Sequence, residues 1–170
     1  AQYAWCQCFA AFIPDHMPAD WGWQVFCAVR DFFQSQLAEH AALIEQVHDA
    51  RDIRGIVDSG KCAGMFTVEG GSFIEGSLDR LHAAADAGVK MLTLTWNGKN
   101  AIASGNVTTD GLSTFGAQVV RAMEQCRMVV DVSHLNDTSF WDVVKASSRP
   151  FAASHSNSRA VCGHPRKLTD

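Results

Sequence analysis

The chain has 170 residues, of which 47% are hydrophobic and 19% are charged, a composition ordinary for a globular domain with a sizeable core. A formal net charge of -4 with interspersed acids and bases excludes a basic stripe for nucleic acid and a cationic face for a membrane surface. No apolar run approaches the roughly 20 residues that span a bilayer, so we expect no membrane segment.

Strand-like and helix-like segments alternate along the chain, which is typical of a parallel α/β sheet. Residues 1–11 predict a strand. A long amphipathic helix is expected to begin near Asp20 and, from the spacing of its apolar residues, to continue through Val47. A second strand at residues 62–68 and a helix at about 77–87 follow.

The second half of the chain predicts three further strands and two helices. The strands are residues 89–95, 128–132 and 151–154; the helices are one capped by Ser113 and one spanning about 136–146. Because the chain begins inside an apolar segment and ends in a loop, we interpret residues 1–170 as the central portion of a single, longer barrel domain.

Five strands with crossover helices fit either an open doubly wound sheet or part of a TIM-type (β/α)8 barrel. Four polar residues fall at or just beyond the C-terminal ends of successive strands, the edge where a TIM barrel collects its chemistry. These are Glu69, Asn97, His134 and His155. Gly70 and Gly71 follow a strand but do not continue as the GxGxxG of a dinucleotide fold. The pattern therefore favours an α/β fold that is part of a barrel.

Glu69, His134 and His155 together form a candidate metal-ligand set, because carboxylate oxygen and neutral imidazole nitrogen are ligands of catalytic zinc. Neighbouring barrel strands would bring the two histidines within reach of one ion. The alternative, that each is a hydrogen-bonded rim residue, stays open. Gly70 and Gly71 would let the backbone approach whatever the carboxylate holds.

Two arginines follow His155. Arg159 is expected on a short helix and Arg166 in the loop after it. A guanidinium at this rim can hold a carboxylate through two hydrogen bonds, whereas the alternative is a surface arginine that pairs locally.

Six cysteines are scattered through apolar segments without a CxxC motif, so we expect reduced core thiols rather than disulfides. Cys6 and Cys8 lie two apart on a predicted strand and share a face, a weak metal signal beside the core-packing interpretation.

Several segments resemble the membrane (renal) dipeptidase family of zinc peptidases, in the same order and at similar spacing. They are VEGG at 68–71, LTLTWN at 92–97, GLSTFG at 111–116, DVSH at 131–134, FWD at 140–142, SHSNSRA at 154–160 and CGHPR at 162–166. The resemblance covers nearly the whole chain and is most specific from Glu69 onward.

The family has an amidohydrolase-type (β/α)8 barrel with two zinc ions, so the resemblance implies that the strands here are about the second to the sixth of that barrel. It implies that Glu69 is the catalytic carboxylate bridging both ions and that His134 and His155 hold one of them. Arg166 matches the arginine that grips the substrate's C-terminal carboxylate, and Arg159 matches a supporting arginine.

The sequence departs from the family pattern in two places. Trp96 stands where mammalian members have a substrate-binding histidine, and bacterial relatives resemble this chain there; we assign Trp96 and Asn97 to the substrate-binding rim. The family's His-x-Asp pair on its first strand and the catalytic Asp on its eighth have no counterpart here. With three ligands for two ions, this chain alone is expected not to hydrolyse dipeptides.

The function implied by the resemblance is hydrolysis of dipeptides by a zinc-bound hydroxide, often with tolerance of a D-residue at the C-terminal position. One alternative is a non-catalytic fragment or degenerate family member that only packs or binds. Another is a different amidohydrolase-type reaction on the same scaffold, such as deacetylation. We further expect a cytoplasmic, bacterial-type protein, and a homo-oligomer is left open.

Overall fold

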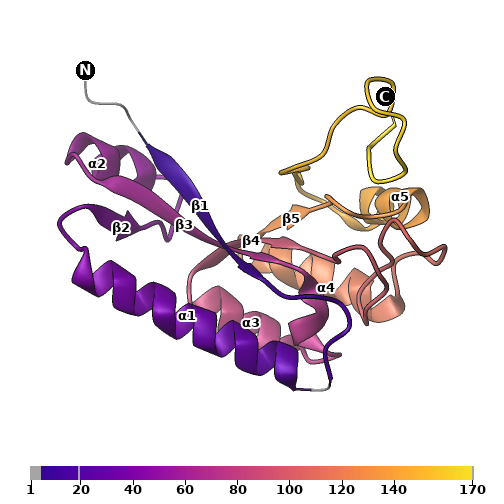
Figure 1. The fold of residues 1–170 in the computed structure, drawn as a ribbon, viewed down its shortest axis with the longest axis horizontal. Helices are drawn as coiled ribbons and strands as arrows, with labels where there is room; N and C mark the ends of the chain where they lie inside the picture. The colour runs from indigo at the N-terminus through magenta and orange to yellow at the C-terminus, as the bar shows by residue number, and fades with distance from the viewer. Residues whose placement is uncertain (1–4, 19, 170) are drawn as a thin grey trace.

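A computed structural model describes residues 5–18 and 20–169 and has an α/β fold (Figure 1). Its strands are β1 (Cys6–Phe12), β2 (Ile44–Gln46), β3 (Cys62–Glu69), β4 (Val89–Thr93) and β5 (Val129–Asp131). Its helices are α1 (Trp21–Glu39), α2 (Asp52–Asp58), the 3-10 helix η1 (Gly71–Ile74), α3 (Leu78–Asp86), α4 (Thr114–Gln125) and α5 (Asp137–Ala146). Within the described ranges no helix is long and apolar enough to cross a membrane.

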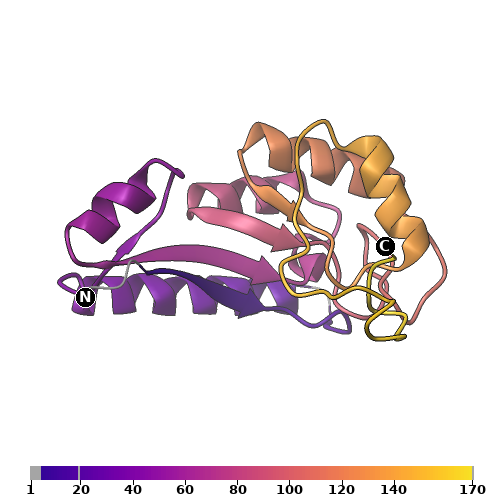
Figure 2. The ribbon, with the colours of Figure 1, turned by 90° about the horizontal axis from the view of Figure 1, so that it is seen from above.

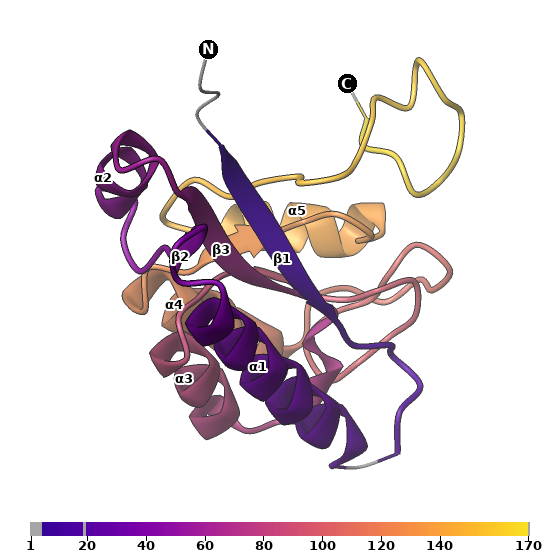
Figure 3. The same cartoon turned by 60° about the vertical axis from the view of Figure 1, so that its left-hand side comes forward.

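The strands form one parallel sheet in which β1, β3, β4 and β5 are neighbours in chain order, while β2 pairs with the beginning of β3. This order fits a barrel segment, because a doubly wound sheet reverses its strand order at a switch point. Helices α1, α3 and α4 lie on one face of the sheet (Figure 3). Helix α2 lies at one end of the sheet and α5 lies at the other (Figure 2).

The core fixes the strand that carries the candidate site. Phe26 and Phe33 of α1 are buried against Phe66 of β3 and Phe73 of η1. The ring centroids of Phe33 and Phe66 lie 4.7 Å apart, and those of Phe26 and Phe73 lie 4.8 Å apart. This aromatic stack holds β3 at Phe66 and η1 at Phe73 against α1. Glu69 lies between these two contacts along the chain, so its position is well defined.

The prediction of one helix running from Asp20 through Val47 was wrong. Helix α1 ends at Glu39, and β2 and α2 follow it. Ile44 pairs with Cys62 at the start of β3, and Val47 is buried in a small cluster with Ile56. Pairing with a distant strand outweighed the local helical spacing of the apolar residues.

The predicted strand at 151–154 is reduced to one parallel bridge between Ala152 and Asp131. It ends there because the backbone N–H of Ser154 donates to the Asp131 carboxylate instead of a neighbouring strand. The short helix expected at Arg159 is also not formed: the backbone N–H of Arg159 donates to Leu168 O at 2.7 Å, which holds this segment as a loop.

The six cysteines are free, as expected, but none is fully buried, and Cys27 is the one that packs against the main core among the described residues. Cys6, Cys8 and Cys162 are exposed, and the other three are half-buried. Cys6 and Cys8 lie on β1, where every residue except Ala11 is exposed.

Gly70 follows Glu69 with φ of 101°, and a Cβ there would lie 2.0 Å from Ile13 O. The backbone at Gly70 therefore comes close to another segment of this chain, the segment after β1. The N–H of Ile13 in that segment donates to Glu69 O at 2.8 Å. We expect Gly70→Ala to lower the free energy of unfolding by about 3 kcal/mol, from backbone strain plus steric overlap. Urea unfolding measures this loss.

The matched control is Gly55→Ala in α2, where a Cβ has nothing within 4 Å. It should leave the protein unchanged or more stable by up to about 1 kcal/mol, because alanine favours helix over glycine. Equal unfolding midpoints for the two variants would contradict the tight packing at Gly70.

Candidate metal centre

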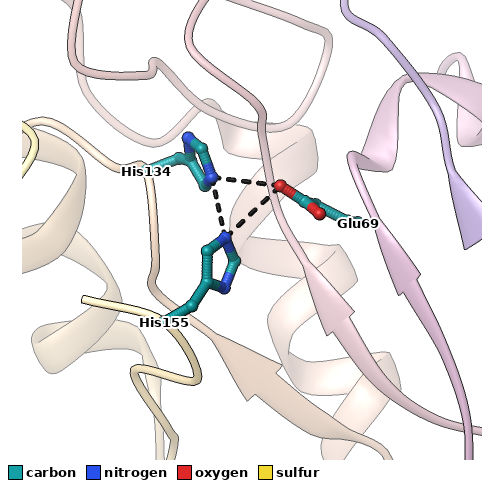
Figure 4. A group of neighbouring side chains, drawn as sticks. All are labelled: Glu69, His134 and His155. Carbon is teal, nitrogen blue, oxygen red and sulfur yellow. Dashed lines mark hydrogen bonds and ion pairs between the residues drawn. The ribbon is translucent and has the colours of Figure 1, made fainter. Parts of the chain in front are cut away.

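Three side chains converge at the C-terminal edge of the sheet (Figure 4). Glu69 ends β3, His134 follows β5, and His155 follows the bridge at Ala152. Glu69 Oε1 lies 3.1 Å from His134 Nε2 and 3.3 Å from His155 Nε2. The two Nε2 atoms lie 2.8 Å apart. In the part of the chain that the structure describes, this is the one group of three or more histidine, cysteine, aspartate or glutamate side chains whose ligand atoms lie close enough together to hold a metal ion.

The backbone at His134 adopts an unusual conformation to bring its ring inward. Its φ is 74°, a left-handed value that costs a non-glycine residue free energy, and such residues gather at functional sites. The N–H of Asn106 donates to His134 O at 2.9 Å and helps to hold this turn. The His134 side chain is only 7% exposed, whereas that of His155 is 43% exposed.

The carboxyl group of Glu69 is held in its charged form. Contact with the His134 imidazole, whose Nε2 lies 3.1 Å from Glu69 Oε1, lowers its pKa, burial opposes this by raising it, and the nearby His155 lowers it as well, so the pKa lies below the usual value for glutamate. The centre therefore combines one negative charge with two imidazole nitrogens, which is suited to a cation.

Asn97, predicted to bind substrate, contacts His134. Its Oδ1 lies 3.0 Å from His134 Nδ1 and accepts a second hydrogen bond from Asn106 Nδ2 at 2.7 Å. An amide oxygen can only accept, so the proton of the His134 ring lies on Nδ1. The Nε2 lone pair then faces Glu69 and His155.

Arg166 reaches this centre, as its assignment to a binding rim requires. Its Nη2 lies 2.9 Å from His134 Nε2. Its Nη1 is buried and has no hydrogen-bond partner among the described residues. A buried guanidinium nitrogen without an acceptor is costly, so the position is suited to an anionic oxygen.

Arg159 is engaged elsewhere. Its guanidinium donates to both carboxylate oxygens of Asp137 at 2.6 and 2.9 Å and to Lys167 O at 2.6 Å. These contacts join the start of α5 to the loop that carries Arg166. The hydrogen bond from Arg159 holds the pKa of Asp137 below its usual value.

Trp96 makes one contact with its backbone and another with its ring. Its backbone N–H donates to Asp15 Oδ1 at 3.0 Å, and the backbone N–H of Gly98 donates to Asp15 Oδ2 at 2.7 Å. The Trp96 ring stands edge-on to Phe12, the strand partner of Glu69, with centroids 5.3 Å apart. Asp15 thereby holds the loop on both sides of Asn97.

Sequence reasoning missed the roles of Asp15 and Asp131. Asp131 is fully buried in β5 and accepts hydrogen bonds from Thr93, Ser133 and Ser154. Burial raises the pKa of Asp131, but the hydrogen bonds together lower it by more, so the pKa lies below the usual value for aspartate. The sequence did carry a signal for Asp131, which is an acidic residue inside an apolar strand. It carried none for Asp15, because no spacing along the chain connects Asp15 with residues 96–98.

Comparison with known proteins places this chain in a family. Residues 3–170 match the family model of the membrane dipeptidases, peptidase family M19. This chain belongs to the membrane dipeptidase family. The predicted family resemblance is confirmed by this match.

Relatives by sequence include both characterised and uncharacterised proteins. The chain is 31% identical over 145 residues to the dipeptidase tcpJ of Claviceps purpurea, covering 82% of this chain and 34% of that protein. It is 30% identical over 161 residues to an uncharacterised protein from the pqqA 5' region of Klebsiella pneumoniae, covering 90% of this chain and 58% of that protein. The chain thus spans little more than half of that relative.

Solved structures of metallopeptidases have the same fold. A metallopeptidase from Rhodobacter sphaeroides, liganded with a phosphinate mimic of the dipeptide L-Ala-D-Ala, superimposes with a TM-score of 0.88 at 24% identity over 95% of this chain and 55% of that chain. The dipeptidase AC, a metallopeptidase of family M19, superimposes with a TM-score of 0.87 at 26% identity over 96% of this chain and 54% of that chain. The predicted fold, part of a TIM-type barrel, is confirmed.

Proposed function

We propose that this chain contributes Glu69, His134 and His155 to a two-zinc centre that hydrolyses dipeptides. The observation that carries the proposal is the convergence of their three ligand atoms, all within 4.8 Å of one another, in a chain that matches the membrane dipeptidases. In this proposal Glu69 would be a ligand of both ions, and His134 and His155 would hold one of them.

The geometry of the donor atoms fits a bound cation. With its proton on Nδ1, His134 directs a lone pair toward His155, whose Nε2 is 2.8 Å away. Two imidazole nitrogens this close repel each other unless a cation or a shared proton lies between them. The charged carboxylate of Glu69 beside both nitrogens favours a cation further.

The chemistry divides between the ions and the protein. Bound zinc would supply Lewis acidity toward a carbonyl oxygen and lower the pKa of water toward neutrality. Arg166 would bind the C-terminal carboxylate of the dipeptide, which fixes the peptide carbonyl beside Glu69. Asn97 would keep the Nε2 of His134 available as a ligand by accepting the hydrogen bond of Nδ1–H.

Arg159 and Trp96, which the sequence assigned to substrate binding, have different roles from each other in this proposal. Arg159 acts indirectly, because its bonds to Asp137 and Lys167 O fasten the loop that carries Arg166. Trp96 contributes an aromatic wall through its contact with Phe12 and lies next to the substrate rather than polarising its carbonyl.

The role of Arg166 distinguishes a dipeptidase from another amidohydrolase. Activity is measured on the protein expressed from its complete gene, because the chain spans only part of its relatives. Arg166→Met should lower kcat/KM for Gly-D-Ala by about 10- to 100-fold, mainly through KM, because charge-assisted hydrogen bonds contribute about 1.5–3 kcal/mol. Hydrolysis of the C-terminal amide of the same dipeptide should change little, since it has no carboxylate.

The control is Arg121→Met, which removes an exposed arginine of α4. Its kinetics should match the unmodified protein on both substrates. Equal losses on acid and amide in Arg166→Met would contradict carboxylate binding. A zinc-loaded protein that hydrolyses N-acetyl amino acids but no dipeptide would replace the proposed function with deacetylation.

A further inference from the structure

A serine hydroxyl lies between the second imidazole of the centre and a buried carboxylate. His155 Nδ1 is 2.7 Å from Ser154 Oγ, and Ser154 Oγ is 2.6 Å from Asp131 Oδ2. The direct distance from His155 Nδ1 to Asp131 Oδ2 is 3.9 Å, too long for a hydrogen bond. Ser154 therefore connects the ring to the carboxylate.

The direction of these hydrogen bonds follows from the donors around Asp131. Its Oδ1 accepts the backbone N–H groups of Ser133 and Ser154, which can only donate, at 3.1 and 3.0 Å. Its Oδ2 accepts the hydroxyls of Thr93 and Ser154, each at 2.6 Å. The carboxylate is fully buried, and its four bonds come from fixed positions in β4 and the segments after β5.

A serine hydroxyl has one proton. Because that proton is donated to Asp131, Ser154 Oγ can only accept from His155. The ring proton of His155 then lies on Nδ1, and the Nε2 lone pair is directed toward Glu69 and His134, which lie 3.3 and 2.8 Å away. The arrangement selects one tautomer and one ring orientation.

His155 needs such a constraint more than His134 does. It lies in a segment without helix or strand, and its side chain is 43% exposed, against 7% for His134. An exposed side chain on a loop loses rotamer freedom when it becomes a ligand. A fixed hydrogen bond at Nδ1 removes most of that cost before a metal binds.

We propose that Ser154, held by Asp131, is a positioning residue that fixes His155 as the Nδ1–H tautomer for metal binding. The inference rests on the proposed zinc centre and assigns a role to two residues outside its ligand set. The contrasting interpretation is that Asp131 and Ser154 only fasten the loop after Ala152. Loop fastening predicts a loss of stability but no specific change in the His155 ring.

The first measurement uses the zinc-free protein expressed from its complete gene. Long-range nitrogen–proton NMR correlation assigns the His155 tautomer near pH 8, with His155→Gln used to identify its signals. Nδ1–H should dominate in the unmodified protein. Ser154→Ala should give a mixture with Nε2–H, the form favoured by free imidazole side chains, while Ser154→Thr should restore Nδ1–H because it keeps the hydroxyl.

The second measurement is zinc affinity by competition with a chromophoric chelator. Ser154→Ala should weaken zinc binding by about 10- to 100-fold, the usual effect of removing a hydrogen-bond partner of a ligand. The matched control is Ser156→Ala, which removes a buried hydroxyl in the same loop that has no hydrogen-bond partner among residues 5–18 and 20–169. It should bind zinc as the unmodified protein does, and Ser154→Thr should recover most of the affinity.

Each outcome decides the inference. An Nε2–H tautomer in the unmodified protein overturns it even if Ser154→Ala fails to fold. Equal zinc affinity in Ser154→Ala and Ser156→Ala overturns it as well. If the unmodified protein binds no zinc, the proposed metal centre is wrong, and the tautomer measurement still tests the hydrogen-bond direction by itself.

Discussion

Replacing Glu69 with glutamine is expected to lower kcat/KM for dipeptide hydrolysis by about 10³-fold or more in the protein expressed from its complete gene. The amide keeps the size of the side chain but loses its charge and one oxygen acceptor. A carboxylate that bridges two cations cannot be replaced by a neutral amide, and metal-assisted stabilisation of the transition state amounts to several kcal/mol, at about 1.4 kcal/mol per tenfold in rate.

Zinc content tests the same substitution independently of activity. The unmodified protein should hold two zinc ions per chain after dialysis, and Glu69→Gln at most one. The control is Glu39→Gln at the end of α1, an exposed glutamate far from the centre, which should keep both ions and full activity. Unchanged zinc content and turnover in Glu69→Gln would rule out the bridging role.

Removal of the His155 imidazole is expected to weaken zinc binding by about 10²- to 10³-fold. Structural sites with four ligands bind zinc with roughly 10–16 kcal/mol, so one ligand contributes about 3–4 kcal/mol. His155→Ala removes one of the two nitrogens that lie 2.8 Å apart, and His134 and Glu69 alone cannot complete a zinc site. Chelator competition measures the affinity, and dipeptide hydrolysis should fall with zinc occupancy.

His82→Ala is the matched control, because His82 is an exposed histidine of α3 outside the centre, with its Nδ1 3.5 Å from Cys126 Sγ. It should bind zinc and hydrolyse dipeptides as the unmodified protein does. An equal loss in both histidine variants would indicate a general effect of the substitution on the protein rather than a ligand at position 155.

Local sequence signals predicted much of the secondary structure correctly. Ser113 caps α4 as expected: its side chain accepts a hydrogen bond from Gly116 N at 2.8 Å. The strands ending near Glu69 and Val132 were predicted from short apolar runs, which need no knowledge of distant residues. β2 was missed, because its three residues become a strand only by pairing with residues 62–64 of β3.

The sequence by itself determined which residues meet at the centre. Glu69 ends β3, His134 follows β5 and His155 follows the bridge at Ala152. The carboxyl ends of parallel strands share one edge of a barrel, so the positions of these residues after their strands are enough to place them on that edge. Only the tertiary structure decided what holds them. Asn97 contacts His134, and Ser154 connects His155 to Asp131. These contacts depend on hydrogen bonds between side chains from separate segments, Asn97 to His134 and Ser154 to Asp131, whose lengths and directions no spacing along the chain encodes.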